Sequence, residues 1–298
     1  MTTAPHPRVA VVGPGAIGTV VAAALHERGR TPFVAGRSAR AGLRLESEHG
    51  VVVVPGPVRT DPTEVGEPVD LVLLAVKATQ ASSSAAWLAA LCGPETVVCV
   101  LQNGVEQVGT VAPLVRGSVV LPAVVWFPAV READGAVRLL AEPRISVPDV
   151  PGAEVVGGAL AGTRVAVDAV ADFPTVAWRK LLQNAAAGLM AVTGRRSGMF
   201  RRDDVAALTL AYLTECLAFA RAEGAVLGDD EPQRLLEAFQ TAPVDRGTSI
   251  LADREHGQPL EWDTRNGVVQ RLGRAHGIPT PVSDVVVPLL AAISDGPG

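Results

Sequence analysis

The sequence is poor in cysteine, in aromatic residues and in charge. Only 3 of its 298 residues are cysteine, 4% are aromatic and 19% are charged. Cys92, Cys99 and Cys216 are scattered, odd in number and surrounded by apolar residues, which argues against a disulfide framework and predicts buried free thiols in a reducing compartment. The five histidines are isolated in the sequence. Because no metal-ligand spacing is present, we expect no metal site.

The sequence also lacks a positive net charge, a recognisable secretion signal and an obvious membrane span. The net charge is -5 and no basic stripe is present, which argues against a nucleic-acid surface. The first residues lack the charged-then-apolar pattern of a signal, because a glycine-rich turn occupies that place. The sequence therefore predicts a cytoplasmic protein with neither a nucleic acid nor a membrane as partner. With 48% hydrophobic residues, a chain of this length has enough apolar material for two domains.

The most informative stretch is RVAVVGPGAIG, residues 8–18. It predicts a buried strand over residues 9–12, a glycine-rich turn and a helix that ends near residue 28. Gly13, Gly15 and Gly18 have the spacing of a dinucleotide-binding turn. In such a turn the first glycine permits the bend, the second lets a pyrophosphate approach the backbone, and the third lets helix and strand pack closely. The helix N-terminus, with Ala16 and Ile17, would offer free N–H groups to the phosphates.

The second predicted strand, residues 31–37, ends in a signal for the type of cofactor. A NAD-binding site usually has an acidic residue here, which accepts hydrogen bonds from the ribose hydroxyls. This chain has Arg37 instead, with Arg40 nearby. A guanidinium suits the additional phosphate of NADPH, whereas a carboxylate would repel it. We therefore favour NADPH; the alternative is that Arg37 is a solvated loop residue.

Two further polar residues follow predicted buried strands. DLVLLAV, residues 70–76, is a continuous apolar run typical of a parallel sheet, and Lys77 comes directly after it. The strand over residues 96–101 is followed closely by Asn103. Parallel sheets bind ligands at the carboxyl ends of their strands. Lys77 is therefore a candidate cofactor contact, and Asn103 is either a ligand-binding amide or part of an Asn-Gly turn.

The hydrophobic pattern changes at about residue 172. Before it, further strands are predicted over residues 50–55, 118–126, 138–140, 144–147 and 164–167, and we expect the later ones to complete the sheet, some of them antiparallel. After it, the pattern is helical almost throughout. The sequence thus predicts an α/β fold. An N-terminal Rossmann-type dinucleotide-binding domain (residues 1–172) is followed by an all-α C-terminal domain (residues 173–298).

The predicted helical half contains its own polar residues. Lys180 and Asn184 are four residues apart, so they share one face of a helix that is otherwise mostly apolar. Lysine is rarely buried without a partner, so Lys180 either extends its ammonium to the surface or lines a cleft with a shifted pKa. Ser249 and Glu261 lie further on, and an acidic residue at the start of a helix, as Glu261 is predicted to be, has an ordinary electrostatic role.

Together these motifs resemble the ketopantoate reductase family over nearly the whole chain. The matching segments are GPGAIG, AVKATQ, LQNGVE, WRKLLQNAAAG and TSILADREHGQPLEWDTRNG. Within them, the polar residues that recur in the family's order are Asn103, Lys180, Asn184, Ser249 and Glu261. The resemblance implies a Rossmann-type NADPH domain, a helical domain and a substrate cleft between them. Arg37 and Lys77 match the family's cofactor-side cations.

The resemblance also implies a reaction, the reduction of the 2-oxo acid ketopantoate to the 2-hydroxy acid pantoate. An ammonium within hydrogen-bond reach of the carbonyl stabilises the charge that hydride transfer leaves on oxygen, and then delivers a proton. The family gives this general-acid role to the lysine that matches Lys180, assisted by Glu261. Asn184 and Ser249 are implied to hold the substrate, and Asn103 is implied to hold either the substrate or the lysine near the nicotinamide.

The chain departs from the family pattern in two places. Gly188 stands where the family usually has a second amide, and RRSG, residues 195–198, replaces another amide in the following loop. We expect the missing side chain to enlarge the pocket and to weaken discrimination for a substrate hydroxyl. The two arginines of the loop either hold a different anionic group or are solvated. Thr193 or Ser197 could substitute in part for the lost amide.

Three functions are compatible with the sequence. The first is an NADPH-dependent reductase of a small 2-oxo acid, with ketopantoate as the first candidate. The second is a family relative that reduces a different carbonyl or an imine. The third is a catalytically inactive NADPH-binding regulator, against which the intact pair Lys180 and Glu261 argues. No Ser/His/Asp arrangement suggests hydrolysis. The sequence leaves the oligomeric state open, with a homodimer as one option.

Overall fold

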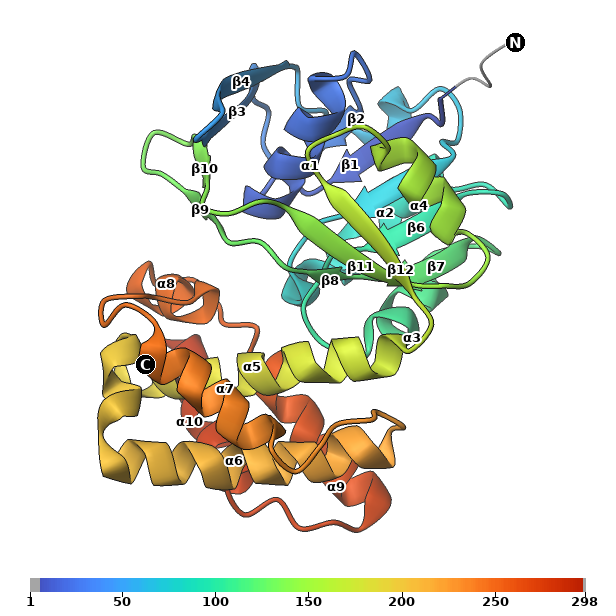
Figure 1. Cartoon of the computed structure of the whole chain (residues 1–298). Helices are drawn as coiled ribbons and strands as arrows, with labels where there is room; N and C mark the ends of the chain where they lie inside the picture. Colours follow the sequence, from blue (N-terminus) through green and yellow to red (C-terminus); the bar gives the residue numbers. More distant parts are fainter. Residues whose placement is uncertain (1–5, 297–298) are drawn as a thin grey trace. The chain divides into compact units, whose positions relative to one another are not determined.

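The computed structural model describes residues 6–296, which form two compact units (Figure 1). Within the described residues, the first unit comprises residues 6–102 and 106–173, and the second comprises residues 103–105 and 174–296. In Figure 1 the strands lie in the part of the chain coloured blue to yellow-green, and the part from yellow to red contains only helices and their connections.

The first unit is built on a five-stranded sheet with strand order β2-β1-β5-β6-β7. Its strands are β1 (Val9–Val12), β2 (Phe33–Ala35), β5 (Leu71–Leu74), β6 (Val97–Val100) and β7 (Val119–Pro122). Every neighbouring pair is parallel. β1, β5 and β6 are buried along their whole length, which explains why each of them is a continuous apolar run in the sequence.

The two faces of this sheet carry separate hydrophobic cores. Because successive side chains of a strand point to opposite faces, Val9 and Val11 belong to one core, and Ala10 and Val12 to the other. The helices that add to the first core are α1 (Ala16–His26) and α4 (Ala153–Leu160), and those that add to the second are α2 (Ala85–Leu91) and α3 (Gln107–Val111). Helices on both faces of a parallel sheet confirm the predicted Rossmann-type fold.

Two smaller sheets complete the first unit, with strand orders β4-β3-β10-β9 and β12-β11-β8. Their strands are β3 (Gly42–Ser47), β4 (Gly50–Pro55), β8 (Val124–Val125), β9 (Ala129–Arg131), β10 (Val137–Leu139), β11 (Arg144–Pro148) and β12 (Ala166–Val170). The expectation that the later strands complete the main sheet is therefore wrong except for β7. The parallel pairing of β10 with β3 joins distant parts of the sequence, which no local pattern reveals.

The mostly apolar stretch of residues 81–91 has the pattern of a helix, but it is α-helical only from residue 85. Two 3-10 turns, Ala78–Gln80 and Ser82–Ser84, precede α2. Further 3-10 turns are Pro62–Glu64, Ala112–Leu114 and Ser197–Arg201. Ser83 Oγ donates to the Gln80 carbonyl at 2.7 Å, and Ser84 Oγ donates to the Ala81 carbonyl at 2.6 Å. Serine hydroxyls that bond to nearby carbonyls compete with regular helix formation, which accounts for the difference.

The second unit is helical. Its helices are α5 (Phe173–Thr193), α6 (Asp203–Ala222), α7 (Glu231–Thr241), α8 (Ser249–Glu255), α9 (Val268–His276) and α10 (Ser283–Asp295), with a π-helical turn at Asp263–Gly267 before α9. Leu181 and Leu182 of α5 share one core with Tyr212 and Phe219 of α6. The structure therefore confirms the predicted change from an α/β to an all-α architecture.

Helix α6 is long and apolar enough to cross a membrane, judged by length and composition alone, with a mean hydropathy of 1.4 over its 18-residue window. In the structure, Tyr212, Leu213, Cys216 and Phe219 of this helix are buried in the core of the second unit. Tyr212, Cys216 and Phe219 are four and three residues apart, with Leu213 beside Tyr212, which places them along one side of the helix. Packing against the other helices thus accounts for its apolar composition.

The cysteine prediction is confirmed in its main point. Cys92, Cys99 and Cys216 are all free thiols. Cys99 and Cys216 are buried, whereas Cys92 is only partly buried. Burial raises the pKa of Cys99 to about 12, so its thiol behaves as an apolar core group.

Three residues that follow β6 belong to the second unit. Val105 packs against the core of that unit. Gly104 has φ +111, and a Cβ placed on it would lie 3.2 Å from the Thr264 carbonyl oxygen, so glycine is required by both conformation and space. The chain bends at residues 103–105. The same bend places the Asn103 side chain among the helices.

Candidate active site

Four of the predicted site residues are joined by hydrogen bonds within the second unit. Asn184 Nδ2 donates to Asn103 Oδ1 at 3.3 Å, and Asn103 Nδ2 donates to Glu261 Oε2 at 3.2 Å. Arg265 Nη2 donates to the same glutamate oxygen at 3.0 Å and to Ser249 Oγ at 3.1 Å. We call these five residues the polar network. They link side chains that the sequence predicted only as separate motifs.

Four separate segments supply the polar network. Asn184 lies on α5, Asn103 follows β6, and Ser249 is the first residue of α8. Glu261 and Arg265 come from the segment before α9, and Arg265 lies in its π-helical turn. Single π-helical turns are frequent at functional sites, because the extra residue in the turn changes the direction of nearby side chains.

Lys180 precedes Asn184 by one turn of α5 and is partly buried. Burial, followed by the positive charges of Arg265 and then Arg246, lowers the pKa of Lys180 from an ordinary 10.5 to about 8. The shifted pKa agrees with that part of the second interpretation that the sequence left open. At neutral pH the side chain is mostly an ammonium, and it gives up its proton more readily than a solvated lysine does.

Arg265 is the member of the polar network that the sequence analysis missed. It is only 2% exposed, and the Glu261 side chain with which it pairs is 6% exposed. Its Nε is buried without a hydrogen-bond partner among the described residues. Arg265 lies inside the matching segment TSILADREHGQPLEWDTRNG, but it is not among the polar residues that recur in the family's order. The signal that could have found it is its position four residues after Glu261, where a cation meets an acid on one helical face.

Each of the three glycines of the N-terminal turn has a different structural reason to be glycine. Gly13 has φ +97, and a Cβ on it would lie 2.7 Å from the Val76 amide nitrogen. A Cβ on Gly18 would collide with the Gly13 carbonyl oxygen. At Gly15, by contrast, an added Cβ meets no atom within 4 Å. The first and third glycines are thus required by packing, whereas the second leaves open space beside the start of α1, which suits a pyrophosphate.

The N-terminus of α1 retains hydrogen-bond donors for an anion. The first bond of the helix runs from the Thr19 N–H to the Gly15 carbonyl, so the N–H groups of Ala16, Ile17 and Gly18 have no acceptor within the helix. No acidic side chain lies in the first turn, and no side chain caps it. The turn and the helix therefore fit the diphosphate of a dinucleotide.

Two arginines converge on this turn. Arg40 Nη1 donates to the Pro14 carbonyl at 3.2 Å, and Arg131 Nη2 donates to the same oxygen. Partial burial and the charge of Arg40 lower the pKa of Arg131. The structure records no carboxylate that pairs with either guanidinium among the described residues. Two cations at one neutral carbonyl form a place where an anion would be stabilised.

The other two cations of the predicted cofactor site lie at strand ends. Arg37 is exposed and comes two residues after β2. Lys77 is partly buried and lies directly before the 3-10 turn that follows β5. β1 neighbours both strands in the parallel sheet, so both cations and the glycine-rich turn lie at the same edge of it.

Comparisons with known proteins identify the family. Residues 9–152 match the model of ketopantoate reductase PanE/ApbA, and residues 172–294 match the model of the ketopantoate reductase PanE/ApbA C terminal region. The chain belongs to the ketopantoate reductase family. A 2-dehydropantoate 2-reductase of Mycobacterium tuberculosis is 56% identical over 291 residues, which cover 97% of this chain and 99% of that protein.

Solved structures of ketopantoate reductases have the same fold. One from Ralstonia eutropha JMP134, of the PanE/ApbA family, is 30% identical with a TM-score of 0.84 and covers 97% of this chain and 98% of that one. A dimeric ketopantoate reductase from Staphylococcus aureus is 24% identical with a TM-score of 0.87, covering 98% and 100%. Membership of the ketopantoate reductase family makes the chain an oxidoreductase.

The space beside Gly188, where the chain departs from the ketopantoate reductase pattern, is filled. A Cβ on Gly188 would lie 2.6 Å from Asn266 Nδ2. Asn266 is fully buried, and its Nδ2 donates to the Ala185 carbonyl at 3.2 Å and to the Tyr212 hydroxyl at 2.9 Å. The expectation that the missing side chain enlarges the pocket is therefore wrong, because the amide of Asn266 occupies this room.

The loop at residues 195–198, the second departure from the ketopantoate reductase pattern, is fixed by its own contacts. Arg196 Nη2 pairs with Glu255 at 2.7 Å, with both side chains well exposed. The Ser197 N–H donates to the Arg246 carbonyl at 3.0 Å, and the Gly198 N–H to the Val244 carbonyl at 2.9 Å. Arg196 thus already has an acidic partner, which favours the interpretation of a solvated loop.

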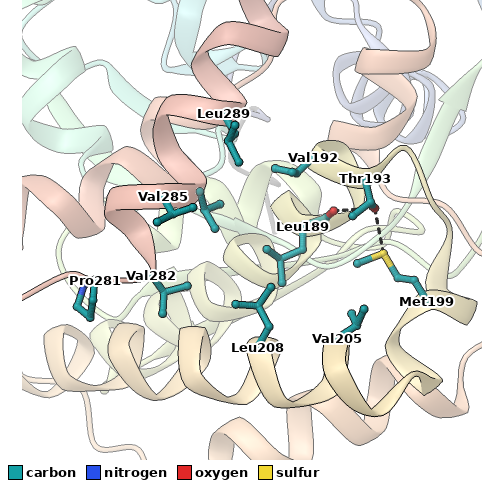
Figure 2. A pocket seen from close by; sticks show the side chains of 11 residues that line it. Leu189, Val192, Thr193, Met199, Val205, Leu208, Pro281, Val282, Val285 and Leu289 are labelled. Atoms are coloured by element: carbon teal, nitrogen blue, oxygen red, sulfur yellow. Dashed lines mark hydrogen bonds between the residues drawn. The ribbon is translucent and has the colours of Figure 1, made fainter.

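An apolar pocket of about 290 Å³ lies between α5, α6 and α10 (Figure 2). Its lining residues are Leu189, Val192, Thr193, Met199, Val205, Leu208, Pro281, Val282, Val285, Val286 and Leu289. Figure 2 shows the Thr193 hydroxyl bonded to the Leu189 carbonyl, at 2.9 Å, and to the Met199 sulfur, at 3.2 Å. Thr193 therefore uses its hydroxyl within this apolar wall, and no member of the polar network lines the pocket.

One group of side chains in the first unit has metal-ligand geometry. Glu48, His49 and Glu142 each offer one ligand atom, all within 4.8 Å of one another, and all three residues are exposed. His49 Nε2 lies 2.8 Å from Glu142 Oε1, which is an ordinary surface ion pair if the imidazole is protonated. We assign no metal to it.

Proposed function

We propose that the protein reduces 2-dehydropantoate, also called ketopantoate, to pantoate with NADPH as the electron donor. The observation that carries the proposal is Lys180, a partly buried lysine with a pKa of about 8 on the same helical face as a residue of the polar network. The identity of 56% to a 2-dehydropantoate 2-reductase supports the choice of substrate.

We assign cofactor binding to the first unit. The backbone positions that would hold the diphosphate are Gly13, Gly15, Ala16, Ile17 and Gly18. Arg37, together with Arg40 and Arg131 near the glycine-rich turn, would hold the additional phosphate of NADPH, and Lys77 would add a further cation at the same sheet edge. When bound, the reduced nicotinamide supplies a hydride. Asn103 belongs to the network of the second unit, which supports its substrate-side role.

We assign the proton transfer to the second unit. Lys180 would stabilise the negative charge that develops on the carbonyl oxygen and then donate a proton to it. A pKa near the working pH makes this transfer more favourable than it would be from a solvated lysine. Glu261, which accepts hydrogen bonds from Arg265 and Asn103, would also accept one from the new hydroxyl or from Lys180.

The charges of Lys180 and of the polar network together suit an anionic substrate. Lys180 and Arg265 contribute two positive charges and Glu261 one negative charge, so these three residues carry a net positive charge at neutral pH. The carboxylate of a 2-oxo acid would be attracted by this charge. Ser249 and the two amides, Asn103 and Asn184, would donate hydrogen bonds to it or to the substrate hydroxyl.

The assembly and the place of action are further parts of the proposal. The dimeric relative from Staphylococcus aureus motivates a homodimer in solution. Light scattering during gel filtration should give a mass of about two chains of 30.8 kDa. We expect the enzyme to act in the cytoplasm, where NADPH is available, without a nucleic acid or a membrane as partner.

The direct test is the loss of NADPH absorbance when purified protein is mixed with ketopantoate. Lys180→Ala should lower kcat by two or more orders of magnitude, about the contribution of a general acid. Arg37→Ala should raise the KM for NADPH much more than the KM for NADH, because only NADPH has the additional phosphate. Equal losses for both cofactors would remove Arg37 from the phosphate site.

A panel of 2-oxo acids, other carbonyl compounds and imines should be assayed beside ketopantoate. The highest kcat/KM for ketopantoate would support the proposal, and a clearly higher value for another compound would assign the chain to a different reaction of the same type. Tight NADPH binding without turnover of any compound would instead indicate an inactive regulator.

A further inference from the structure

Arg265 links Ser249 to the rest of the polar network. Its Nη2 is bonded both to Glu261, which is implied to assist catalysis, and to Ser249, which is implied to hold the substrate. The guanidinium extends the hydrogen-bond chain from Asn184, Asn103 and Glu261 to Ser249. No motif or comparison assigns a role to this arginine.

We propose that Arg265 is a positioning residue of the reductase site, which orients the Ser249 hydroxyl toward the substrate carboxylate and fixes the Glu261 carboxylate for the proton-transfer step. The inference rests on the proposed function, and it names how the same site holds its substrate. Arg265 is 2% exposed, so it acts through its neighbours and does not itself contact the substrate.

The direction of its hydrogen bond leaves the Ser249 hydroxyl able to donate to a ligand. Arginine can only donate, so the Ser249 oxygen is the acceptor in the bond of 3.1 Å to Arg265. The hydroxyl proton therefore points away from the guanidinium and can be donated to another group. Ser249 is an exposed residue, so a ligand can reach it. A hydroxyl polarised by a cation is a good donor to a carboxylate.

Two donors hold one oxygen of the Glu261 carboxylate. Oε2 accepts from Arg265 at 3.0 Å and from Asn103 at 3.2 Å, so two segments hold the same carboxylate atom. Two hydrogen bonds to the same oxygen restrict the rotation of the carboxylate. Because Lys180 responds to the charge of Arg265, the arginine also lies close enough to influence the proposed proton donor.

The burial of Arg265 is not explained by its contribution to the stability of the fold. A buried ion pair often contributes less to stability than apolar residues of the same size would, and here one guanidinium nitrogen, Nε, is buried without a partner among the described residues. A purely structural position would favour an apolar side chain. The charge at this position is therefore better explained by the substrate-binding and proton-transfer groups that it touches.

A double-mutant cycle tests the inference. The variants are Arg265→Met, Arg265→Lys, Ser249→Ala and the double variant Arg265→Met with Ser249→Ala, each checked for folding by circular dichroism. Arg265→Met should raise the KM for ketopantoate about tenfold, since a hydrogen bond to a charged group is lost. Added to Ser249→Ala, the same change should raise KM less than about twofold, because its effect on binding acts through Ser249.

Two further readouts separate positioning from a structural role. Arg265→Lys retains the charge and should recover part of the lost kcat/KM. In Arg265→Met the alkaline limb of the pH–rate profile should move to higher pH, because one of the cations that lower the pKa of Lys180 is gone. If Arg265→Met does not fold, Arg265→Lys combined with Ser249→Ala provides the same cycle.

The outcomes are distinct. Additive effects on KM would show that Arg265 binds substrate independently of Ser249 and would overturn the inference. Unchanged KM, kcat and pH profile with only a lower melting temperature would reduce Arg265 to a structural residue. A wild-type protein that turns over none of the 2-oxo acids would refute the proposed function itself, whereas an active wild type with additive variants refutes only the role of Arg265.

Discussion

The pH dependence of the reaction should report the environment of Lys180. Because the ammonium is the reactive form, kcat/KM should fall as the lysine loses its proton. With a pKa of about 8, roughly one lysine in eleven is protonated at pH 9, so kcat/KM should be about tenfold lower there than at pH 7. A lysine with an ordinary pKa of 10.5 would lose only about 3% of its ammonium form by pH 9.

A substitution at Arg246 can change the pKa of Lys180 without altering the polar network. It is exposed, and its charge is the last of the three causes that lower the pKa of Lys180, after burial and Arg265. In Arg246→Gln this repulsion is lost, so the alkaline limb should move to higher pH while the plateau at lower pH is retained. The shift should shrink in high salt, because exposed charges are screened.

The assay is the initial rate of NADPH consumption at low ketopantoate concentration, measured between about pH 6.5 and about pH 10. Lys180→Arg is the control, because it keeps a positive charge that cannot dissociate in this range. It should be at least about 100-fold slower and should show no limb near pH 8. A wild-type profile that stays flat to pH 9, or a limb that persists in Lys180→Arg, would refute the assignment of the proton donor.

Three further substitutions test other parts of the structure. Gly15→Ala places a methyl group in the open space of the glycine-rich turn, so the Kd for NADPH, measured by fluorescence titration, should rise about tenfold or more while the melting temperature changes little. Gly188→Ala forces Asn266 from its hydrogen bonds and should lower the free energy of unfolding by about 1–3 kcal/mol in urea titrations. Gly157→Ala, in α4 with open space around its Cβ, is the matched control and should be neutral or stabilising by up to about 1 kcal/mol. Glu261→Gln removes the charge that pairs with Arg265; we expect a lower kcat with a smaller change in KM, and an unchanged kcat would contradict the role of Glu261.

Much of the fold could be predicted from local sequence, because the relevant signals are local. β1, β5 and β6 are buried on both faces and therefore are uninterrupted apolar runs. The glycine spacing at the end of β1 has a single structural context. The two small sheets could not be placed in the same way. Their strands are short, and β3 pairs in parallel with β10, a partner far away in the sequence.

The candidate site could be predicted in part for a similar reason. Asn103, Asn184, Ser249 and Glu261 lie in motifs of the ketopantoate reductase family, and the structure joins them by hydrogen bonds; their roles remain predictions. Arg265 also lies in one of these matching segments, but it is not among the polar residues that recur in the family's order, and its contacts appear only in three dimensions.

The amide of Asn266 beside Gly188 shows the same limit. Both residues lie in helical segments, and the sequence gives no sign that the side chain of one fills the space left by the other. Reasoning about a missing side chain at one position therefore fails when a distant residue takes its place. Only the packed structure shows such compensation between positions.

Because residues 103–105 belong to the helical unit, the two units cannot be separated by a simple truncation of the chain. No single cut of the chain yields two fragments that each contain all of their own unit. A fragment beginning at residue 174 would lack the Asn103 amide and leave Glu261 with one donor fewer. Attempts to produce the helical half alone, or to exchange it between relatives, should therefore transfer the tripeptide as well, for example through a designed linker.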